Sequence, residues 1–381
     1  MRGKKIVFIS EECLDLNGRY LKCATELAEA GANVQTLVLT DSGRKDSPNW
    51  HYIRRPNWGV GELGSTLSYR VLKRRAQKFL KTQKYDAYHA MDYVSLDVAA
   101  HAKERLAGKI IFDACEIFTE TAFSTPALKN YVQKIFDRSA QSIDAVLTPN
   151  TYLRDYYTKL CPHWPRAQII TNAPKFNLEQ PYDGRMHRAL GLESTEKILL
   201  YHGAFSALRG LQGLIDTASA LPERHTLVLM GYGALEAELK IRAKHVNKEA
   251  RRQVVQFLDP VPNNDLLLWI SGAHYGLIPY ENGPLNHSYC TPNKLYEYPA
   301  AGVPILATNL PTLSDIINRY NIGVIMDFPM TGSKIKLSVQ KQERSLLAKG
   351  CESMALAEAW TANAVRLKQT YQSLLTKSVD A

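Results

Sequence analysis

The chain has 381 residues, of which 45% are apolar, 22% charged and 9% aromatic. These are values of an ordinary globular protein, so they argue against a disordered chain, a collagen-like repeat and a small disulfide scaffold. The length predicts two domains and leaves a third open. With 47 basic and 37 acidic residues, the net charge is +10, which favours a polyanion, an anionic membrane surface or phosphorylated substrates as partners.

The first apolar run, residues 6–9, is too short for the core of an export signal, and no apolar run reaches the length of a membrane span. We therefore expect a cytoplasmic protein. The cysteines show neither a Cys-x-x-Cys pair nor a zinc spacing with histidines. The sequence thus predicts reduced thiols and no metal site. The six cysteines lie at positions 13, 23, 115, 161, 290 and 351.

The first half of the chain repeats a strand, helix, strand pattern. Residues 6–9 are a continuous apolar run of the kind buried in parallel sheets, and a polar turn with Asn17 and Gly18 precedes apolar residues at helical spacing. Gly31 is expected to end this helix, and residues 34–39 form the next strand. Such a unit makes a parallel pair of strands with a right-handed crossover. Further strands are predicted at residues 85–89, 109–113, 145–148 and 168–171.

The same pattern restarts after Pro174, with strands predicted at residues 197–201, 226–230, 254–257, 274–279 and 303–307. The fold class is therefore α/β, with two Rossmann-like domains that are hinged near residues 172–190 and face each other across a cleft. Residues 327–352 receive no assignment, and residues 356–375 are predicted to form one helix. Ligands of open parallel sheets bind beyond the carboxyl ends of the strands, so the polar turns there are the candidate sites.

Residues 276–304 are the most informative stretch. Thr291 followed by Pro292 predicts an N-cap and the first position of a helix, whose free N–H groups together with Lys294 suit a pyrophosphate. Glu297 lies on roughly the same side of that helix, and we expect this carboxylate to accept hydrogen bonds from ribose hydroxyls. A capped surface helix with a Lys–Glu pair is the alternative that these residues leave open.

Residues 292–304, Pro-Asn-Lys-Leu-Tyr-Glu-Tyr-Pro-Ala-Ala-Gly-Val-Pro, resemble the donor-binding segment of the retaining, nucleotide-sugar-dependent glycosyltransferases with the GT-B fold, a family 4-like group of bacterial polysaccharide and lipid-glycan enzymes. Other similar stretches are residues 112–116, 201–210, 229–233 and 256–261. The resemblance implies the GT-B fold, with an N-terminal acceptor-binding domain at 1–175 and a C-terminal donor-binding domain at 176–360. Its last helix, at about 361–381, is expected to pack back on the N-terminal domain.

The resemblance also implies an activity and a set of site residues. The activity is transfer of a sugar from a UDP- or GDP-sugar to a hydroxyl of a glycan or lipid-linked glycan, without a cofactor or a metal ion. Arg209, Lys294 and Glu297 are the expected catalytic residues, because cations stabilise the charge that develops on the leaving diphosphate. The expected donor-binding residues are Gly18, Gly203, Gly233, Val261, Asn286, Tyr289, Thr291 and Asn293.

Three polar residues that follow predicted strands, His89, Asp92 and Glu116, are candidates for the acceptor side. A strand-end Asp or His is more often a satisfied cap than a catalyst, and that alternative stays open for each of them. His202 is expected to be a buried strand residue.

Four positions depart from the family pattern. Tyr289 stands where many relatives have the first glutamate of a Glu-x7-Glu pair, and Ala204 stands where an arginine is usual. Arg209 replaces a lysine, and Cys115 replaces a histidine. Two alternatives therefore remain: an inverting GT-B glycosyltransferase, and a non-catalytic sugar-nucleotide-binding or scaffold protein. An NAD-dependent oxidoreductase is disfavoured because its glycine fingerprint is absent from the sequence.

Residues 70–84 carry seven cations and no acid, with Leu72, Ala76, Phe79 and Leu80 at helical spacing. The apolar side packs on the sheet or dips into a lipid surface, and the cations face outward. The resemblance implies lipid-linked acceptors at the cytoplasmic leaflet, and on that ground we expect peripheral contact with the inner face of the cell membrane. A solvated helix face is the alternative. No nucleic-acid recognition motif accompanies this charge, so nucleic acid is not an expected partner.

Overall fold

The chain divides into two compact units. A computed structural model describes residues 1–11, 14, 17–40, 45–54, 56, 62–103, 107–121, 124–175, 181–341 and 344–376. Unit 1 comprises Met1–Asn172 and Thr361–Ala381, and unit 2 comprises Ala173–Trp360. The cysteine at position 13 and residues 377–381 of the last expected helix lie outside the described residues. The five described cysteines are free thiols.

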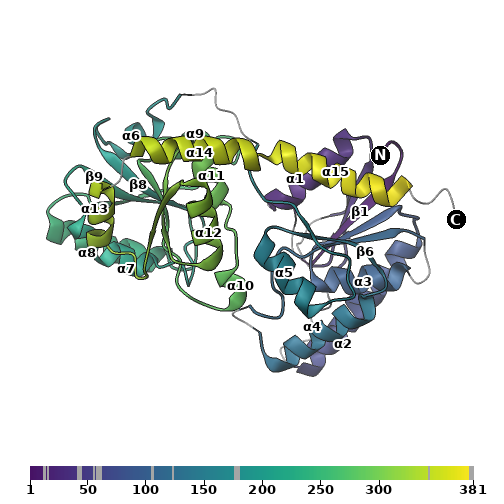
Figure 1. The fold of residues 1–381 in the computed structure, drawn as a ribbon. Helices are drawn as coiled ribbons and strands as arrows, with labels where there is room; N and C mark the ends of the chain where they lie inside the picture. The colour runs from purple at the N-terminus through teal and green to yellow at the C-terminus, as the bar shows by residue number, and fades with distance from the viewer. Residues whose placement is uncertain are drawn as a thin grey trace. The chain divides into compact units, whose positions relative to one another are not determined.

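Unit 1 is built on a seven-stranded parallel sheet in the order β3-β2-β1-β4-β5-β6-β7 (Figure 1). Helices cover both faces of this sheet, which explains why its strands are apolar runs without alternation. The six strands predicted for this unit are confirmed, whereas β3 is only three residues long and carries no readable pattern. The strands are β1 (Lys5–Ser10), β2 (Asn33–Val38), β3 (Trp50–Tyr52), β4 (Ala87–Ala90), β5 (Lys109–Asp113), β6 (Ile143–Thr148) and β7 (Gln168–Ile169).

Three helices of unit 1 begin at residues whose side chains cap them. The Asn17 side chain accepts a hydrogen bond of 3.0 Å from the backbone N–H of Tyr20, and Thr125 and Asn150 cap α4 and α5 in the same way. Gly31 has φ +89° just beyond the end of α1, as predicted. The helices are α1 (Gly18–Glu29), α2 (Glu62–Lys81), α3 (Tyr93–Lys103), α4 (Pro126–Ser139), α5 (Thr151–Leu160) and α15 (Trp360–Thr376).

Unit 2 contains a six-stranded parallel sheet in the order β10-β9-β8-β11-β12-β13. The five predicted strands are confirmed, and β13, which ends just before the unassigned stretch at residues 327–352, was not predicted. The strand order reverses between β8 and β11, and a reversal of this kind opens a crevice at the carboxyl ends of the two strands. The strands are β8 (Lys197–His202), β9 (His225–Met230), β10 (Val255–Leu258), β11 (Tyr275–Ile278), β12 (Ile305–Thr308) and β13 (Gly323–Met326).

The helices of unit 2 form two layers (Figure 1). One group of mutually contacting elements is α7, α8, η2 and α13, and the other is α9, α11, α12 and α14. The elements are α6 (Arg185–Leu190), α7 (Leu211–Asp216), η2 (Ala218–Ala220), α8 (Glu236–Ala250), α9 (Leu266–Ile270), α10 (Leu285–Ser288), α11 (Lys294–Ala300), α12 (Pro311–Tyr320), α13 (Gly332–Lys341) and α14 (Arg344–Glu358).

The single helix predicted at residues 356–375 is wrong. Helix α14 ends at Glu358 and α15 begins at Trp360, because the Trp360 backbone N–H donates to the carbonyl of Pro174 at 3.2 Å instead of continuing the pattern of α14. The Trp360 side chain is fully buried. The division between the two units falls at this break.

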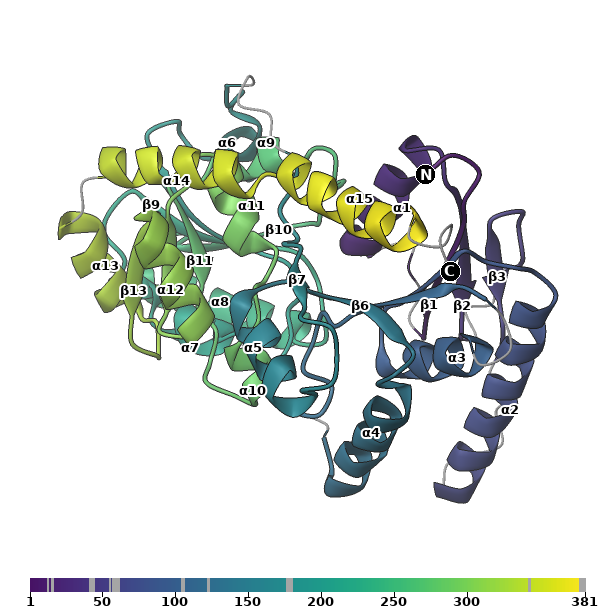
Figure 2. The same ribbon diagram turned by 45° about the vertical axis from the view of Figure 1, so that its right-hand side comes forward.

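Helix α15 packs into unit 1, where it lies beside α1 (Figure 2). The Tyr371 hydroxyl lies 2.6 Å from Nδ1 of His89, which belongs to β4. The side-chain amide of Asn363 contacts both the backbone N–H and the hydroxyl of Thr171, at 2.9 and 2.8 Å. These buried polar contacts join the end of the chain to the core of unit 1.

Helix α2 contains residues 70–81 of the basic segment. Leu72, Ala76 and Leu80 have no exposed surface and belong to the core of unit 1, so the apolar stripe packs on the protein and is not available to a lipid. Lys73 pairs with the buried Asp97 at 2.7 Å. The exposed cations of the segment are Arg70, Arg74, Arg75, Lys78, Lys81 and Lys84. In the part of the chain that the structure describes, no helix is long and apolar enough to cross a membrane.

Candidate functional site

The candidate site lies at the carboxyl ends of β8 and β11, where the strand order of unit 2 reverses. Gly203 directly follows β8, and Tyr280 comes two residues after the end of β11. The Thr308 hydroxyl, at the end of β12, donates to the backbone carbonyl of Tyr280 at 2.5 Å and holds it in place. Three neighbouring strand ends therefore position this part of the site.

Glycines allow the loops after β8 and β9 to pack backbone against backbone. Gly231 and Gly233 have φ +150° and +157°. A Cβ on Gly231 would collide with the carbonyl of Gly203, and a Cβ on Gly233 would lie 2.5 Å from the carbonyl oxygen of Phe205. Gly203 itself has φ +116°, and a Cβ there would lie 3.4 Å from the Nζ of Lys294. The glycine at 203 thus leaves room beside an ammonium group.

Lys294, the first residue of α11, places its ammonium group in this space. The residue is only 7% exposed, and its Nζ donates a hydrogen bond of 2.9 Å to the Tyr280 hydroxyl. The Nζ also lies 4.9 Å from the centroid of the Tyr201 ring. Within the described residues, no carboxylate forms a salt bridge with it. Burial lowers the pKa of Lys294, since a buried charge without a counter-ion is costly.

Arg209 lies against the ring of Tyr280, whose hydroxyl accepts the hydrogen bond from Lys294. Its guanidinium carbon is 4.2 Å from the centroid of the Tyr280 ring, while the Nζ of Lys294 is 5.1 Å from the same centroid. The loop that carries Arg209 packs closely against the chain just after β11. A Cβ on Gly210 would therefore collide with the carbonyl of Pro279. The structure therefore brings two of the predicted catalytic residues to one aromatic ring.

Glu297 lies on the same short helix as Lys294. Its Oε2 is 3.4 Å from Nε2 of His202, and the two side chains are 13% and 8% exposed. Burial, reinforced by the charge of Lys294, holds the pKa of His202 well below its usual range. The pair is therefore a carboxylate beside a neutral imidazole rather than an ion pair. His202 is buried, as predicted, at the end of β8.

The predicted N-cap at Thr291 is wrong. Helix α11 begins at Lys294, and its N-cap is Asn293, which has helical φ and ψ angles and makes no capping bond with its side chain. The chain enters the helix through a tight turn in which the Leu295 N–H donates to the Pro292 carbonyl at 2.9 Å. The positive charge at this site comes from the side chains of Lys294 and Arg209.

The other predicted donor-binding residues of unit 2 lie in α10, in its connection to α11 and after β10. Asn286 lies in α10 and Tyr289 directly follows it, both half-buried. Thr291 is half-buried and Asn293 exposed in the connection to α11. Val261 follows β10 and packs against the core of unit 2.

The remaining predicted site residues belong to unit 1. Gly18 is the first residue of α1, and a Cβ there would meet no atom within 4 Å, so protein packing does not require glycine at this position. Asp92 precedes α3 and accepts from the Ser95 backbone N–H at 2.7 Å and from the Glu11 N–H at 2.7 Å, which is the satisfied cap that the sequence left open. Glu116 is exposed after β5.

His89 has no exposed surface, which argues for a structural role rather than contact with an acceptor. Its ring nitrogens lie 2.6 Å from the Tyr371 hydroxyl and 3.4 Å from Oδ2 of Asp113. Burial lowers the pKa of His89. Asp113 also accepts two hydrogen bonds of 2.7 Å from the Arg19 guanidinium, which is 5% exposed. This buried network connects α1, β4, β5 and α15.

Sequence reasoning missed Tyr280, which contacts both cations, and Arg19, which pairs with Asp113. For Tyr280 a signal was present, because it directly follows the strand predicted at residues 274–279. No such signal marks Arg19, because its partner lies far away in the sequence. In the described part of the chain, no cluster of three or more histidine, cysteine, aspartate or glutamate residues could hold a metal ion.

Comparisons with known proteins agree with this geometry. Residues 196–329 match the family model described as glycosyl transferases group 1. A comparison with curated protein sequences gives no match.

Several solved structures resemble the whole chain. Sucrose-phosphate synthase from Thermosynechococcus elongatus aligns with a TM-score of 0.76 at 18% identity, over 98% of this chain and 100% of that one. HepE from Anabaena, in complex with UDP, aligns with a TM-score of 0.74 at 12% identity, over 97% and 100%. WaaG, a glycosyltransferase involved in lipopolysaccharide biosynthesis, aligns with a TM-score of 0.61 at 16% identity, over 98% of each chain.

These identities are below 25%, so the likenesses establish the fold alone. The two parallel-sheet units are those of the GT-B fold that the sequence predicted. The matched segment contains Gly203, Arg209, Lys294 and Glu297. The chain therefore has the GT-B fold, and residues 196–329 in its second unit match the family model described as glycosyl transferases group 1.

Proposed function

We propose that the protein is a retaining glycosyltransferase that moves a sugar from a nucleoside diphosphate sugar to a hydroxyl of a glycan or lipid-linked glycan. One observation carries the proposal: Lys294 is a buried cation at the strand ends of unit 2 that forms no salt bridge with a carboxylate among the described residues. An anionic ligand would supply the missing counter-charge. The UDP and UDP-glucose bound in the HepE structures support a nucleoside diphosphate sugar as that ligand.

In the proposed reaction, the diphosphate of the donor lies against Lys294 and Arg209. The bond between the anomeric carbon and the diphosphate oxygen breaks, and negative charge develops on that oxygen. The two cations stabilise this charge more strongly in the transition state than in the ground state, which accelerates the step. The hydrogen bond from Lys294 to Tyr280 keeps the ammonium group in position before the donor arrives.

The leaving phosphate oxygen takes the proton of the acceptor hydroxyl as that hydroxyl attacks from the same face of the sugar. The configuration at the anomeric carbon is therefore retained, and no carboxylate nucleophile of the kind used by retaining glycosidases is needed. Glu297 accepts hydrogen bonds from the ribose hydroxyls in this proposal. Because side-chain cations neutralise the diphosphate, the reaction is expected to proceed unchanged in the presence of EDTA.

We propose that acceptors reach the enzyme at the cytoplasmic surface of an anionic membrane, with α2 as the contact. The exposed cations on α2 support this proposal. Since Leu72, Ala76 and Leu80 are buried in unit 1, the contact would be electrostatic and without insertion of this helix into the lipid. The description of WaaG as an enzyme of lipopolysaccharide biosynthesis supports a lipid-linked acceptor.

The test is a screen of UDP- and GDP-sugars for thermal stabilisation and slow hydrolysis, followed by NMR of the product with the best donor. Retention of the anomeric configuration is the expected result. Inversion would instead support an inverting GT-B enzyme. Donor binding without turnover for any acceptor would support the sugar-nucleotide-binding protein that Ala204 and Cys115 leave open as an alternative.

A further inference from the structure

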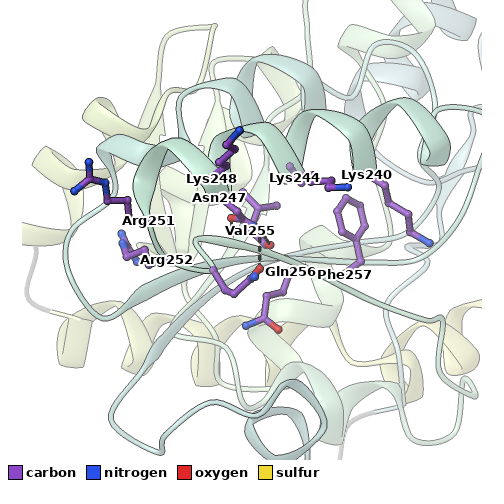
Figure 3. A pocket seen from close by; sticks show the side chains of 11 residues that line it. Lys240, Lys244, Asn247, Lys248, Arg251, Arg252, Val255, Gln256 and Phe257 are labelled. Carbon is purple, nitrogen blue, oxygen red and sulfur yellow. Dashed lines mark hydrogen bonds between the residues drawn. The ribbon is translucent and has the colours of Figure 1, made fainter.

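A basic groove runs between α8 and the edge strand β10 of unit 2, away from the residues around Lys294 (Figure 3). Its volume is about 720 Å³, which lies within the range of small-molecule sites. None of its lining residues is acidic. The five cations that line it are Lys240, Lys244, Lys248, Arg251 and Arg252.

The charges of α8 are segregated between its two sides. Lys240, Lys244 and Lys248 recur at every fourth position, so they share the side facing the groove and span about 12 Å along the helix. The arginine elsewhere on the helix is neutralised, since Arg242 pairs with Asp216 at 2.7 Å and with Glu238 at 2.9 Å.

On the groove side, only one lysine is paired. Lys240 contacts Glu236 at 2.7 Å, at the end of the groove near the start of α8. Within the described residues, no acidic side chain contacts Lys244, Lys248 or Arg251. The groove therefore has an excess of positive charge that its own walls do not compensate.

Both arginines are held in ways that favour a ligand. Arg251 has φ +53° at the end of α8, a left-handed position where glycine or asparagine is usual. Arg252 donates to the carbonyls of Leu221, Pro222 and His225 at 3.0 to 3.2 Å, so its guanidinium is fixed without being neutralised.

At one point on the floor of the groove, the edge of β10 cannot pair with an added strand. Asn247 accepts a hydrogen bond from the Val255 N–H at 2.8 Å and donates to the Val255 carbonyl at 2.8 Å. The side chain of Asn247 thus takes the place that a neighbouring strand would occupy on this edge of β10. This closure disfavours an extended peptide as the occupant.

We propose that this groove is a second anion-binding site, for a ligand that carries several clustered phosphate groups. Three lysines in a row match phosphates spaced along the helix, and guanidinium groups bind phosphate oxygens with two parallel hydrogen bonds. The site shares no residue with the proposed donor site, so it is distinct from the nucleoside diphosphate sugar position. Such a ligand can be a free polyphosphate or the phosphorylated headgroup of a lipid.

The experiment measures two probes on the full chain: inorganic tripolyphosphate by calorimetry, and phosphatidylcholine vesicles containing phosphatidylinositol bisphosphate by co-sedimentation. The groove variant is Lys244→Gln with Lys248→Gln. Its matched control is Lys336→Gln with Lys349→Gln, two exposed lysines of unit 2 on α13 and α14. A Lys294→Ala variant separates binding in the groove from binding at the proposed donor site.

We expect the groove variant to bind at least about tenfold more weakly, because two charge-assisted contacts are lost, while the control and Lys294→Ala retain this binding. If the groove variant loses binding of tripolyphosphate in calorimetry, the ligand is a free polyphosphate. If it loses only binding to the vesicles, the ligand is the phosphorylated headgroup of a lipid. The groove variant and its matched control both keep the cations of α2, so the difference in binding between them reports on the groove. Equal affinities of the groove and control variants, a loss confined to Lys294→Ala, or no binding of either probe would overturn the proposal.

Discussion

Lys294 and Tyr280 are joined by a hydrogen bond of 2.9 Å between the ammonium Nζ and the phenolic hydroxyl, both at the carboxyl ends of the strands of unit 2. Tyr280 is 2% exposed, and Arg209 lies against its ring. One aromatic residue therefore gathers the two cations on which the proposed chemistry depends. The same pair explains why Lys294 is held in a buried position that costs free energy.

Lys294→Met is expected to lower kcat/KM by about 100-fold or more, because it removes a preorganised charge from the leaving diphosphate. Without donor, its free energy of unfolding should be unchanged or higher, since the variant no longer buries an uncompensated ammonium. Steady-state kinetics and urea denaturation check the two effects. Lys349→Met, at an exposed position on α14, is the control and should alter neither. A destabilised Lys294→Met that keeps full activity would contradict the assignment.

Donor affinity is expected to fall with rising pH. The fall should begin at a lower pH than it would if Lys294 had the pKa of an ordinary lysine. Burial lowers the pKa of Lys294 from 10.5, and the protonated form binds the diphosphate. Affinity should therefore hold below the lowered pKa and decrease as pH rises through it. The stability of the unliganded protein should change in the opposite direction. The unfolded chain binds this proton more tightly than the folded chain does, so the free energy of unfolding rises with pH between the lowered pKa and 10.5. Calorimetric titrations across this pH range measure both trends. Lys294→Met is the reference variant and should lack them.

Gly210→Ala is expected to destabilise the protein and reduce activity. Gly210 has φ +64°, and an added Cβ would collide with the carbonyl of Pro279, which would push the loop carrying Arg209 away from Tyr280. Gly213→Ala is the matched control, because this glycine lies within α7 and a Cβ there meets nothing within 4 Å. The control should gain about 0.5–1 kcal/mol. Thermal melting and kinetics of both variants check the contrast, and similar behaviour would refute it.

Asp113→Asn is expected to destabilise unit 1 by about 3–5 kcal/mol, because it leaves the buried Arg19 guanidinium without its charge partner. The control is Asp155→Asn, which breaks the pair with Arg154 at a residue that is 59% exposed and should cost less than about 1 kcal/mol. Urea unfolding measures both. A loss in Asp113→Asn no larger than in the control would show that the network is not a structural clamp.

The α2 surface predicts salt-dependent binding to anionic vesicles. Arg74→Glu with Lys78→Glu should weaken binding by about 1 kcal/mol for each cation removed, and the effect should vanish at high salt. Lys134→Glu with Lys159→Glu changes the same charge on α4 and α5 of the same unit and should have a smaller effect. Vesicle co-sedimentation across a salt series checks this. Binding that resists salt would point to insertion, which the burial of Leu72 disfavours.

The strands and the fold could be predicted from the sequence because their signals are local. Apolar runs such as residues 109–113 and 197–201 end in polar turns, and this alternation with helical segments specifies parallel sheets. The position of Gly203 just beyond a predicted strand was readable for the same reason, whereas the helix start predicted at Thr291 and Pro292 was wrong. Residues 327–352 received no assignment, although the Thr331 hydroxyl accepts a hydrogen bond of 3.3 Å from the Lys334 N–H at the start of α13, a local capping signal that the prediction missed.

The sequence by itself determined the α/β class, the two sheets and the stretches in which candidate site residues lie. Only the tertiary structure decided which strands are neighbours, that Tyr280 unites Arg209 with Lys294, that α11 begins at Lys294 and that His89 is buried. The physical reason is that secondary structure follows from the order of side chains along a short segment. Burial, ion pairing and pKa values depend instead on which distant segments pack together.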